Sequence, residues 1–501
     1  MFEYLWGKKA QARYLIIATI LLLGFMLGAR ELWTMEARWA DIVMNFFYRD
    51  DFLHPYLNGE AYYDKPLLSY WFMSVFYYFS HSAFALRLPS AIAAGVSVWA
   101  IFRLGEKLYS REAGLISAWM LLTTFYFLFF GRVASADMLN LCGTLLAVLW
   151  YVKKETQTTF VTYFVFFLII ALTSLCKGLL GAVLPVLVIL PDLIRNKAWK
   201  AHFNPAFFIA AALGVLVYCF PFWLSSHFNG VNYAESGLWE VFRENILRFY
   251  KPFDHRGSIA TYFIYFPLYL LPWTFFFIPA LAKQVKTWHA LVWEVKWMCL
   301  ATLLIFCFFT VSLSRRSYYI LPILPYAILL TAHWIQAGGV LIARVRIAGV
   351  VTVLFYLLSV LFFVAAVPVF YCDGGQREFT SSLRTQATES RPWDQWRIVL
   401  YGAPKKSSFY IQSDYEPKYI ALPARYRQLI KLQPLGVGHL RDAWPSLKAL
   451  KPNQIIVTRS EFKEAFQKML PSYRMVEARQ VFGERLLGVE ARDDAVAFIP
   501  G

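Results

Sequence analysis

Charged side chains recur at the ends of the apolar segments of this sequence, where an isolated charge is costly. Two of them are acids: Glu36 follows the first apolar segment, and Asp137 lies between the third and the fourth. A carboxylate in such a position can orient an attacking oxygen or take a proton from it, and nearby cations would keep it ionised. The competing interpretation of each acid is a structural ion pair.

Basic residues accompany the acids. Lys65 lies in the sequence Tyr-Tyr-Asp-Lys-Pro, which begins at Tyr62, and several turns between apolar segments also carry Lys or Arg. The cationic set comprises Arg38, Lys65, Arg87, Arg132, Lys177, Arg248, His255, Arg256, Arg315 and Arg316. Each alone could be a side chain that anchors a helix at the membrane surface. Because short outer turns are usually poor in Lys and Arg, one shared anionic ligand explains the set better than separate coincidences.

Cations around one or two acids at a membrane surface suit group transfer from a lipid phosphate. The leaving phosphate gains negative charge in the transition state, and fixed Lys and Arg side chains are its natural stabilisers. The aromatic and nearly uncharged segment 67–79 is typical of a helix that lies in the membrane interface. Such a helix would admit a lipid tail and exclude water, but these placements name neither the sugar nor the acceptor.

Apolar segments long enough to cross a membrane must position these residues. We count eleven, near residues 14–30, 86–102, 113–131, 136–152, 160–176, 178–194, 204–224, 259–282, 297–313, 317–335 and 347–371. With the amino terminus in the cytoplasm, 16 Lys and Arg of the membrane part lie inside and 13 outside, most of the latter in long segments where the rule has little force. The odd number of spans then puts everything after residue 371 outside.

The composition supports a membrane body with a soluble tail. Of 501 residues, 58% are hydrophobic and only 16% are charged, which excludes a soluble globular protein and a disordered chain. Residues 371–501 nevertheless hold 20 of the 49 Lys and Arg and 14 of the 32 Asp and Glu. We therefore expect a transmembrane domain over residues 1–371, with an outer loop at 31–85, and a soluble domain over residues 372–501.

The tail mixes two kinds of pattern. Residues 397–401, 454–458 and 484–489 read as strands, and residues 441–450 and 461–469 read as helices, which predicts a small α/β domain. The net charge of +17 comes from scattered residues, which favours anionic lipid over nucleic acid as the partner. Five of the six cysteines lie in or beside apolar segments and Cys372 stands alone in the tail, so neither a disulfide framework nor a thiolate metal site is indicated. A divalent metal is possible, but no ligand spacing indicates one.

The same residues carry a resemblance to a known family. Residues 34–39 (TMEARW), 57–66 (LNGEAYYDKP) and 69–71 (SYW) resemble the first outer loop of the bacterial aminoarabinose lipid A transferases. These enzymes belong, with the protein O-mannosyltransferases, to the multi-span GT-C glycosyltransferases. Later landmarks follow in order at residues 87–90, 131–132, 137, 176–178, 185, 248–249, 272–273, 314–316 and 319–322. The match covers most of residues 30–325, and the tail resembles the family only in its position.

The resemblance implies an inverting transferase in the bacterial inner membrane, with its active site on the periplasmic side. Its donor would be a sugar linked to undecaprenyl phosphate, its acceptor lipid A or a related envelope glycan, and no cofactor is indicated. Lys65 and Tyr62 would hold the donor phosphate, while Glu36 and Asp137 would be the catalytic acids. The wider donor-binding set would be Arg38, Arg132, Lys177, Arg248, His255, Arg256, Arg315, Arg316 and Tyr319.

One position departs from the family. The first loop of the family usually opens with an Asp-Glu pair, whereas this chain has Met35 before Glu36. Either Glu36 does the work of the missing acid, or the acceptor is already ionised and needs little help from a base. A lipid A phosphate is such an acceptor, and a Ser or Thr hydroxyl is not.

Two other functions compete with this interpretation. A protein O-mannosyltransferase-like enzyme would share the donor chemistry and differ in its acceptor. A transporter or flippase for a lipid-linked sugar would be expected to show paired inverted repeats, which are not visible in the sequence, and it would not need the soluble tail.

Overall fold

The computed structural model describes residues 10–32, 34–57, 60–154, 157–195, 199–228, 237–239, 242–251, 257–337, 341–367, 375–401, 403, 407–413, 429–432, 452–477 and 495–501. The chain divides into two compact units. Unit 1 comprises Met1–Phe25, Tyr63–Phe72 and Arg87–Leu361. Unit 2 comprises Met26–Tyr62, Met73–Leu86 and Phe362–Gly501. Cys372, the predicted strand at 484–489 and the predicted helix at 441–450 lie outside the described residues.

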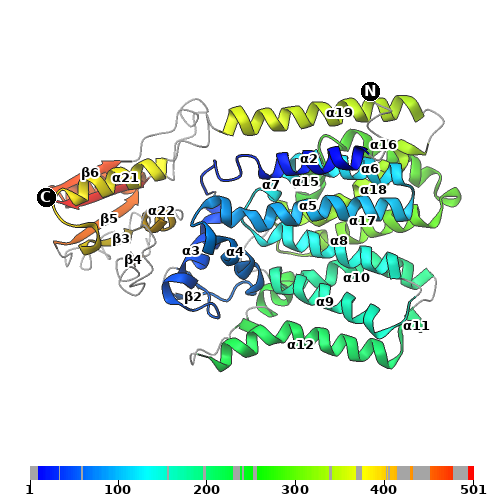
Figure 1. Cartoon of the computed structure of the whole chain (residues 1–501), viewed down its shortest axis with the longest axis horizontal. Helices are drawn as coiled ribbons and strands as arrows, with labels where there is room; N and C mark the ends of the chain where they lie inside the picture. Colours follow the sequence, from blue (N-terminus) through cyan, green and yellow to red (C-terminus); the bar gives the residue numbers. More distant parts are fainter. Residues whose placement is uncertain are drawn as a thin grey trace. The chain divides into compact units, whose positions relative to one another are not determined.

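Unit 1 is built mainly from apolar helices, of which α5 begins with four residues of unit 2 (Figure 1). They are α2 (Ala10–Gly24), α5 (Ala83–Leu108), α6 (Arg111–Leu122), α7 (Phe125–Gly131), α8 (Ala136–Lys154), α9 (Phe160–Lys177), α10 (Leu180–Arg195), α12 (Pro205–His227), α15 (Thr261–Tyr269), α16 (Thr274–Lys286), α17 (Trp293–Val311), α18 (Leu324–Gln336) and α19 (Leu341–Leu361). Shorter elements join them: α11 (Trp199–His202), the π-helix η1 (Arg243–Leu247), α14 (Arg248–Tyr250), η2 (Trp288–Ala290) and η3 (Ser317–Ile323).

The packing of the unit 1 helices leaves an apolar outer surface. Helix α9 packs against α8, α10 and α12, and α17 and α18 pack against each other (Figure 1). Ten of the 13 residues of α18 are buried, whereas α12 exposes Phe208, Ile209, Val215 and Leu216. An exposed apolar face of this kind is what lipid solvates. Among the described residues, six helices are long and apolar enough to cross a membrane, or up to eight if each of two bent pairs is one span. The protein is therefore a multi-pass membrane protein, and the count of eleven spans stays a prediction.

The bent pairs explain part of the difference from the sequence count. The predicted span at 113–131 is two helices, α6 and α7, bent by 68°. At the break, Thr123 Oγ1 donates to Trp119 O over 2.7 Å, and Thr124 Oγ1 donates to Met120 O over 2.7 Å. Such back-bonding competes with the helical ladder and bends helices. The predicted span at 259–282 is likewise α15 and α16, bent by 113°.

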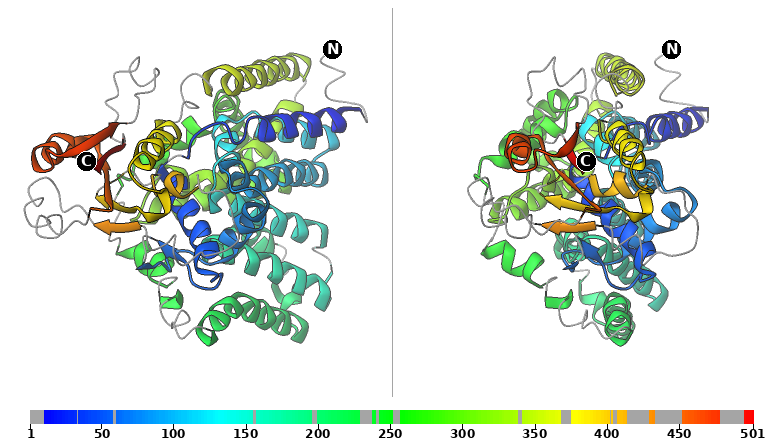
Figure 2. Two further views of the ribbon diagram at one scale, coloured as in Figure 1. Left: turned by 60° about the vertical axis from the view of Figure 1, so that its left-hand side comes forward. Right: turned by 90° about the vertical axis from the view of Figure 1, so that its left-hand side faces the viewer.

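The strands of unit 2, coloured from yellow to red in Figure 2, form a sheet. It has five strands in the order β4-β3-β5-β7-β6. Its strands are β3 (Arg397–Tyr401), β4 (Leu429–Leu432), β5 (Gln454–Arg459), β6 (Tyr473–Glu477) and β7 (Ala495–Pro500). Strand β3 pairs in parallel with β4 and β5, while β7 runs antiparallel to β5 and β6. The predicted strands at 397–401 and 454–458 are thus present. The predicted helix at 461–469 is the turn η7 (Ser460–Phe462) followed by α25 (Lys463–Met469).

Helices cover both faces of the central strands. As a result, β3 and β5 are buried along nearly their whole length. On one face α21 (Gly375–Thr388) contributes Phe379 and Leu383, and on the other Phe466 of α25 packs with Val399. Helix α22 (Ser407–Ser413) contacts α3 (Thr34–Arg49), which belongs to the predicted outer loop. The Leu32 N–H donates to the Tyr410 hydroxyl over 2.9 Å, so the segment before α3 is fixed to the tail.

Two further elements lie in the predicted outer loop. A two-stranded hairpin pairs β1 (Tyr56–Leu57) with β2 (Glu60–Ala61), and helix α4 (Leu68–Phe79) follows the Lys65 motif. The predicted interfacial segment 67–79 is therefore a helix. It exposes large apolar side chains, with Val75 57% and Phe79 79% exposed, as a helix in contact with lipid would.

Candidate functional site

Lys65 is held by a buried acid that the sequence did not single out. Its ammonium lies 3.3 Å from Oε2 of Glu244 and donates to the carbonyl of Asp64 over 2.9 Å. The Glu244 side chain is only 4% exposed, and that of Lys65 is 18% exposed. Glu244 lies in the π-helix η1, 179 residues from Lys65, and no sequence pattern links the two. Both residues belong to unit 1.

A tight turn joins the Lys65 segment to a second pair of charges. The Ser69 hydroxyl, four residues after Lys65 and in the first turn of α4, donates to the carbonyl of Cys176 over 3.1 Å. Gly178, two residues further on, has φ +97, and a Cβ there would lie 2.6 Å from Oδ1 of Asn245 in η1. A glycine is required at this position because other residues avoid that backbone region and the space is already filled. The turn thus packs against both the Lys65 segment and η1.

Asp137 and Lys177 form an ion pair beside this turn. Asp137 lies in the first turn of α8 and Lys177 is the last residue of α9, and their side chains are 8% and 11% exposed. The Lys177 ammonium also lies 5.6 Å from the centre of the Tyr319 ring, within range of a cation–π interaction. Three of the predicted site residues therefore meet in unit 1.

Close helix packing fixes this pair. A Cβ at Gly143 of α8 would lie 2.0 Å from Oγ1 of Thr173 in α9, so the two helices touch through a residue without a side chain. Thr173 is one helical turn before Lys177, and small residues are the usual way in which membrane helices approach so closely. The position of the Asp137–Lys177 pair is therefore set by a rigid helix contact.

The other predicted acid lies in unit 2. Glu36 is fully buried and pairs with Arg30, whose Nη2 is 3.0 Å from its Oε2. Nearby in the same helix, Arg38 donates to the Tyr62 hydroxyl over 2.9 Å. Unit 2 thus contains two separate pairs, Glu36 with Arg30 and Arg38 with Tyr62. Arg30 was not among the predicted site residues, because a cation before the first outer helix carries no signal by itself.

Two of the predicted phosphate ligands bind backbone carbonyls. Arg132 is 7% exposed, and its guanidinium donates to the carbonyls of Leu22 and Phe25 over 2.6 and 2.7 Å. Arg315 donates to the carbonyls of Thr310 and Gly257 over 2.7 and 2.6 Å. The last carbonyls of a helix have no partner within it, and these arginines supply one at the ends of α2 and α17. The contacts support a structural role for both residues.

We expect Arg132→Gln to destabilise the protein. The substitution removes charge-assisted bonds from a buried site, and the expected cost is about 2–4 kcal/mol. Thermal unfolding of the detergent-solubilised protein measures this loss, with Lys107→Gln, a change of an exposed lysine in α5, as the control. Unchanged stability together with weaker donor binding would instead return Arg132 to the ligand-binding set.

The remaining predicted residues are described only in part. His255 and Arg256 lie outside the described residues, and of Arg248 the structure describes the backbone, at the first position of α14. Arg87 is fully buried in α5. Among the residues that the structure describes, no group of three or more His, Cys, Asp or Glu could hold a metal ion.

Known proteins match this chain in sequence. A family model described as dolichyl-phosphate-mannose-protein mannosyltransferase matches residues 64–224, the stretch that holds Lys65, Asp137 and Lys177. An undecaprenyl phosphate-alpha-4-amino-4-deoxy-L-arabinose arabinosyl transferase of Yersinia enterocolitica is 26% identical over 370 residues, which are 70% of this chain and 64% of that enzyme. The enzyme of the same name from Shewanella sediminis is 27% identical over 401 residues, 76% of this chain and 69% of its own. The chain thus spans slightly less than two thirds of the Yersinia relative.

Solved structures share the fold. ArnT from Cupriavidus metallidurans bound to undecaprenyl phosphate matches with a TM-score of 0.73 at 14% identity, over 98% of both chains. The archaeal oligosaccharyltransferase AglB from Archaeoglobus fulgidus matches with a TM-score of 0.53 at 12% identity, over 90% of this chain and 69% of its own. The comparisons confirm the resemblance to the aminoarabinose transferases and the GT-C fold that it implies.

Proposed function

We propose that this protein is an inverting glycosyltransferase of the bacterial inner membrane. It moves a sugar from an undecaprenyl-phosphate-linked donor to lipid A or a related envelope glycan on the periplasmic face. The amino terminus is cytoplasmic, about eleven spans form residues 1–371, and the α/β domain at 372–501 is periplasmic. The relatives whose names state this donor chemistry, and the fold shared with a structure bound to undecaprenyl phosphate, support the proposal.

The observation that carries the donor assignment is the Lys65–Glu244 pair. A lysine that is largely buried, lies in the family motif and faces a carboxylate occupies a place where the structure already accommodates an anion. We assign Lys65 to the donor phosphate, with Lys177 and Tyr319 near it in the same unit and Tyr62 and Arg38 as further donor-binding residues. Arg248, His255, Arg256 and Arg316 remain proposed helpers.

The chemistry is a displacement at the anomeric carbon. The bond from that carbon to the phosphate oxygen breaks, the electron pair leaves with undecaprenyl phosphate, and a new bond forms from the acceptor oxygen on the opposite face. Lys65 stabilises the growing phosphate charge. If the acceptor is a hydroxyl, its proton must pass to Glu36 or Asp137; if it is an ionised phosphate, no proton moves.

Removing the charge of Glu244 tests the assignment of Lys65. A donor phosphate must displace the Glu244 carboxylate from the ammonium, so we expect Glu244→Gln to bind undecaprenyl phosphate several-fold more tightly than the wild type. Titration of the purified protein with the carrier lipid measures the change. The control is Glu106→Gln, a partly exposed acid that pairs with Arg103 in α5, away from the Lys65 contacts. Weaker binding in Glu244→Gln would mean that the acid orients Lys65 and does not compete with the ligand.

A second acceptor class has one observation in its favour. The family model that matches residues 64–224 is described by a protein mannosyltransferase activity, in which the acceptor is a protein. A protein hydroxyl needs a base, whereas Met35 stands where the related enzymes usually carry an acid. We therefore favour the lipid A acceptor and keep the protein hydroxyl as the alternative.

A reconstituted transfer assay tests the function itself. Purified protein in liposomes, given an undecaprenyl-phosphate-linked aminoarabinose and lipid A, should release undecaprenyl phosphate and glycosylated lipid A in equal amounts. Transfer to a peptide, with lipid A unchanged, would support the second acceptor. Movement of the donor across the bilayer with no product would support a transporter.

The orientation has a test of its own. Parity from a cytoplasmic amino terminus places Cys372 in the periplasm, so a membrane-impermeant maleimide should label it in intact spheroplasts. The described cysteines Cys142 and Cys176 are buried, and the others lie in apolar helices, so they should react poorly. Cys372→Ser should abolish the labelling. Labelling that requires lysis would contradict the proposed topology.

A further inference from the structure

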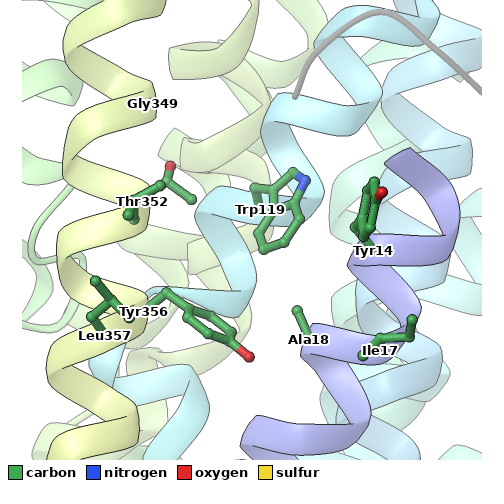
Figure 3. Close-up of a pocket in the computed structure, with 9 residues that line it drawn as sticks. Tyr14, Ile17, Ala18, Trp119, Gly349, Thr352, Tyr356 and Leu357 are labelled. Carbon is green, nitrogen blue, oxygen red and sulfur yellow. The ribbon is translucent and has the colours of Figure 1, made fainter. Parts of the chain in front are cut away.

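A groove of about 290 Å³ lies between α2, α6 and α19 of unit 1 (Figure 3). Its lining includes Tyr14, Ile17, Trp119, Gly349, Thr352 and Leu357. Apolar side chains and ring faces dominate this lining, and the Thr352 hydroxyl is occupied by a bond to the carbonyl of Ala348. An apolar groove of this kind does not hold ordered water and favours a hydrocarbon occupant.

One polar group in the groove has no hydrogen-bond partner. Trp119 is 8% exposed, and its indole Nε1 is buried without a hydrogen-bond acceptor. Figure 3 shows the nitrogen on the edge of the ring that faces Tyr14. Other indoles of this unit are satisfied: Trp273 Nε1 donates to Met120 O over 2.8 Å, and Trp297 Nε1 donates to Val188 O over 2.6 Å. A donor left without a partner in hydrocarbon is costly, so an occupant that brings an acceptor oxygen would be favoured here.

The groove has a cationic end. Tyr14 and Gly349 lie at one end of it and Ile17 and Leu357 toward the other (Figure 3). The residues just beyond the first end are Arg13, next to Tyr14, and Arg346, about one helical turn before Gly349, and both are exposed. Two exposed arginines at the mouth of a hydrocarbon groove match an anionic lipid head group.

We propose that the groove binds one acyl chain of an anionic glycerophospholipid from the bilayer. The head-group phosphate lies by Arg13 and Arg346, an ester carbonyl accepts the hydrogen bond of Trp119 Nε1, and the chain continues past Thr352 toward Leu357. Along the groove, the arginines come first, then the indole, then the apolar stretch. The phosphate, the ester and the acyl chain follow one another in the same order in such a lipid. This site is separate from the Lys65 and Asp137 clusters and does not depend on the proposed function.

Native mass spectrometry of the delipidated full-length protein tests the proposal. We expect a first phosphatidylglycerol to bind more tightly than a phosphatidylethanolamine with the same chains. Each of Arg13→Gln and Arg346→Gln should reduce that preference by about five-fold. Gly349→Leu places a side chain in the groove and should abolish the tight binding. Val350→Leu, a change of the exposed neighbour that does not line the groove, is the matched control.

The proposed hydrogen bond from the Trp119 indole to an ester carbonyl is tested with a lipid that lacks the carbonyl. Ether-linked phosphatidylglycerol lacks the ester carbonyls, so the wild type should bind it about five-fold more weakly than the ester lipid. Trp119→Phe keeps the ring and loses only the N–H donor, and it should bind both lipids equally. Equal binding of the two head groups by the wild type, or tight binding that survives in Gly349→Leu, would overturn the proposal. Displacement of the lipid by undecaprenyl phosphate would assign the groove to the carrier and would also overturn it.

Discussion

Lys65→Met is expected to lower the rate of sugar transfer by a factor on the order of 10²–10³, the usual effect of losing one group that stabilises developing charge. Methionine keeps most of the side-chain length and removes the charge, so the Lys65 environment loses little packing. Steady-state transfer by the purified variant measures the effect, with donor binding measured in parallel. The loss should appear mainly in kcat, because the phosphate charge grows in the transition state.

Two controls separate this effect from misfolding. Lys65→Arg keeps the charge and should retain part of the activity, although the planar guanidinium of arginine differs in shape from an ammonium. Lys296→Met removes a lysine from the amino-terminal part of α17, away from the Lys65 contacts, and should leave turnover unchanged. A well-folded Lys65→Met variant with near-normal transfer would remove Lys65 from the site.

Glu36→Gln and Asp137→Asn are the second pair of large effects. Each change keeps the shape of the side chain and removes its charge, so a loss reports electrostatics or proton transfer. We expect both variants to lose most of their activity, with Glu36→Gln the worse, because Met35 offers no second acid. Each change also breaks a buried ion pair, to Arg30 or to Lys177, so thermal unfolding must be recorded beside activity.

Met35→Asp then distinguishes the acceptors. It restores the acidic pair of the related enzymes, and with an already ionised phosphate acceptor it should change transfer very little. A large gain would favour a hydroxyl acceptor, because only a hydroxyl must give up a proton. Met35→Asn, which is similar in size to aspartate and carries no charge, is the matched control.

The sequence could predict which residues meet when they lie at the ends of neighbouring helices. Asp137 and Lys177 lie at the same end of adjacent predicted spans, so the sequence places them on one face of the membrane, together with Tyr319. The ion pair between them was not predicted. The strands at 397–401 and 454–458 are also visible in sequence, because β-branched and aromatic runs mark buried strands. Composition alone indicated the multi-pass membrane body.

The partners of Lys65 and Glu36 could not be predicted in this way. Glu244 is 179 residues from Lys65 in a loop without periodicity, and only the tertiary fold brings it there. Nor could the sequence distinguish an arginine that binds phosphate from one that caps a helix. Arg132 and Arg315 lie at helix ends, where an arginine can do either. The attachment of the first outer helix to the tail, through Leu32 and Tyr410, likewise depends on packing between distant segments.

The lipid A of cells with and without this gene gives the most direct test of the proposed function. Mass spectrometry of lipid A should show a species heavier by one sugar residue in the wild type, and the deletion strain should lack it. The wild-type gene should restore the species and Lys65→Met should not, although both proteins insert equally. Identical lipid A spectra from wild-type and deletion strains, under conditions in which the protein is made, would contradict the proposal that it transfers a sugar to lipid A.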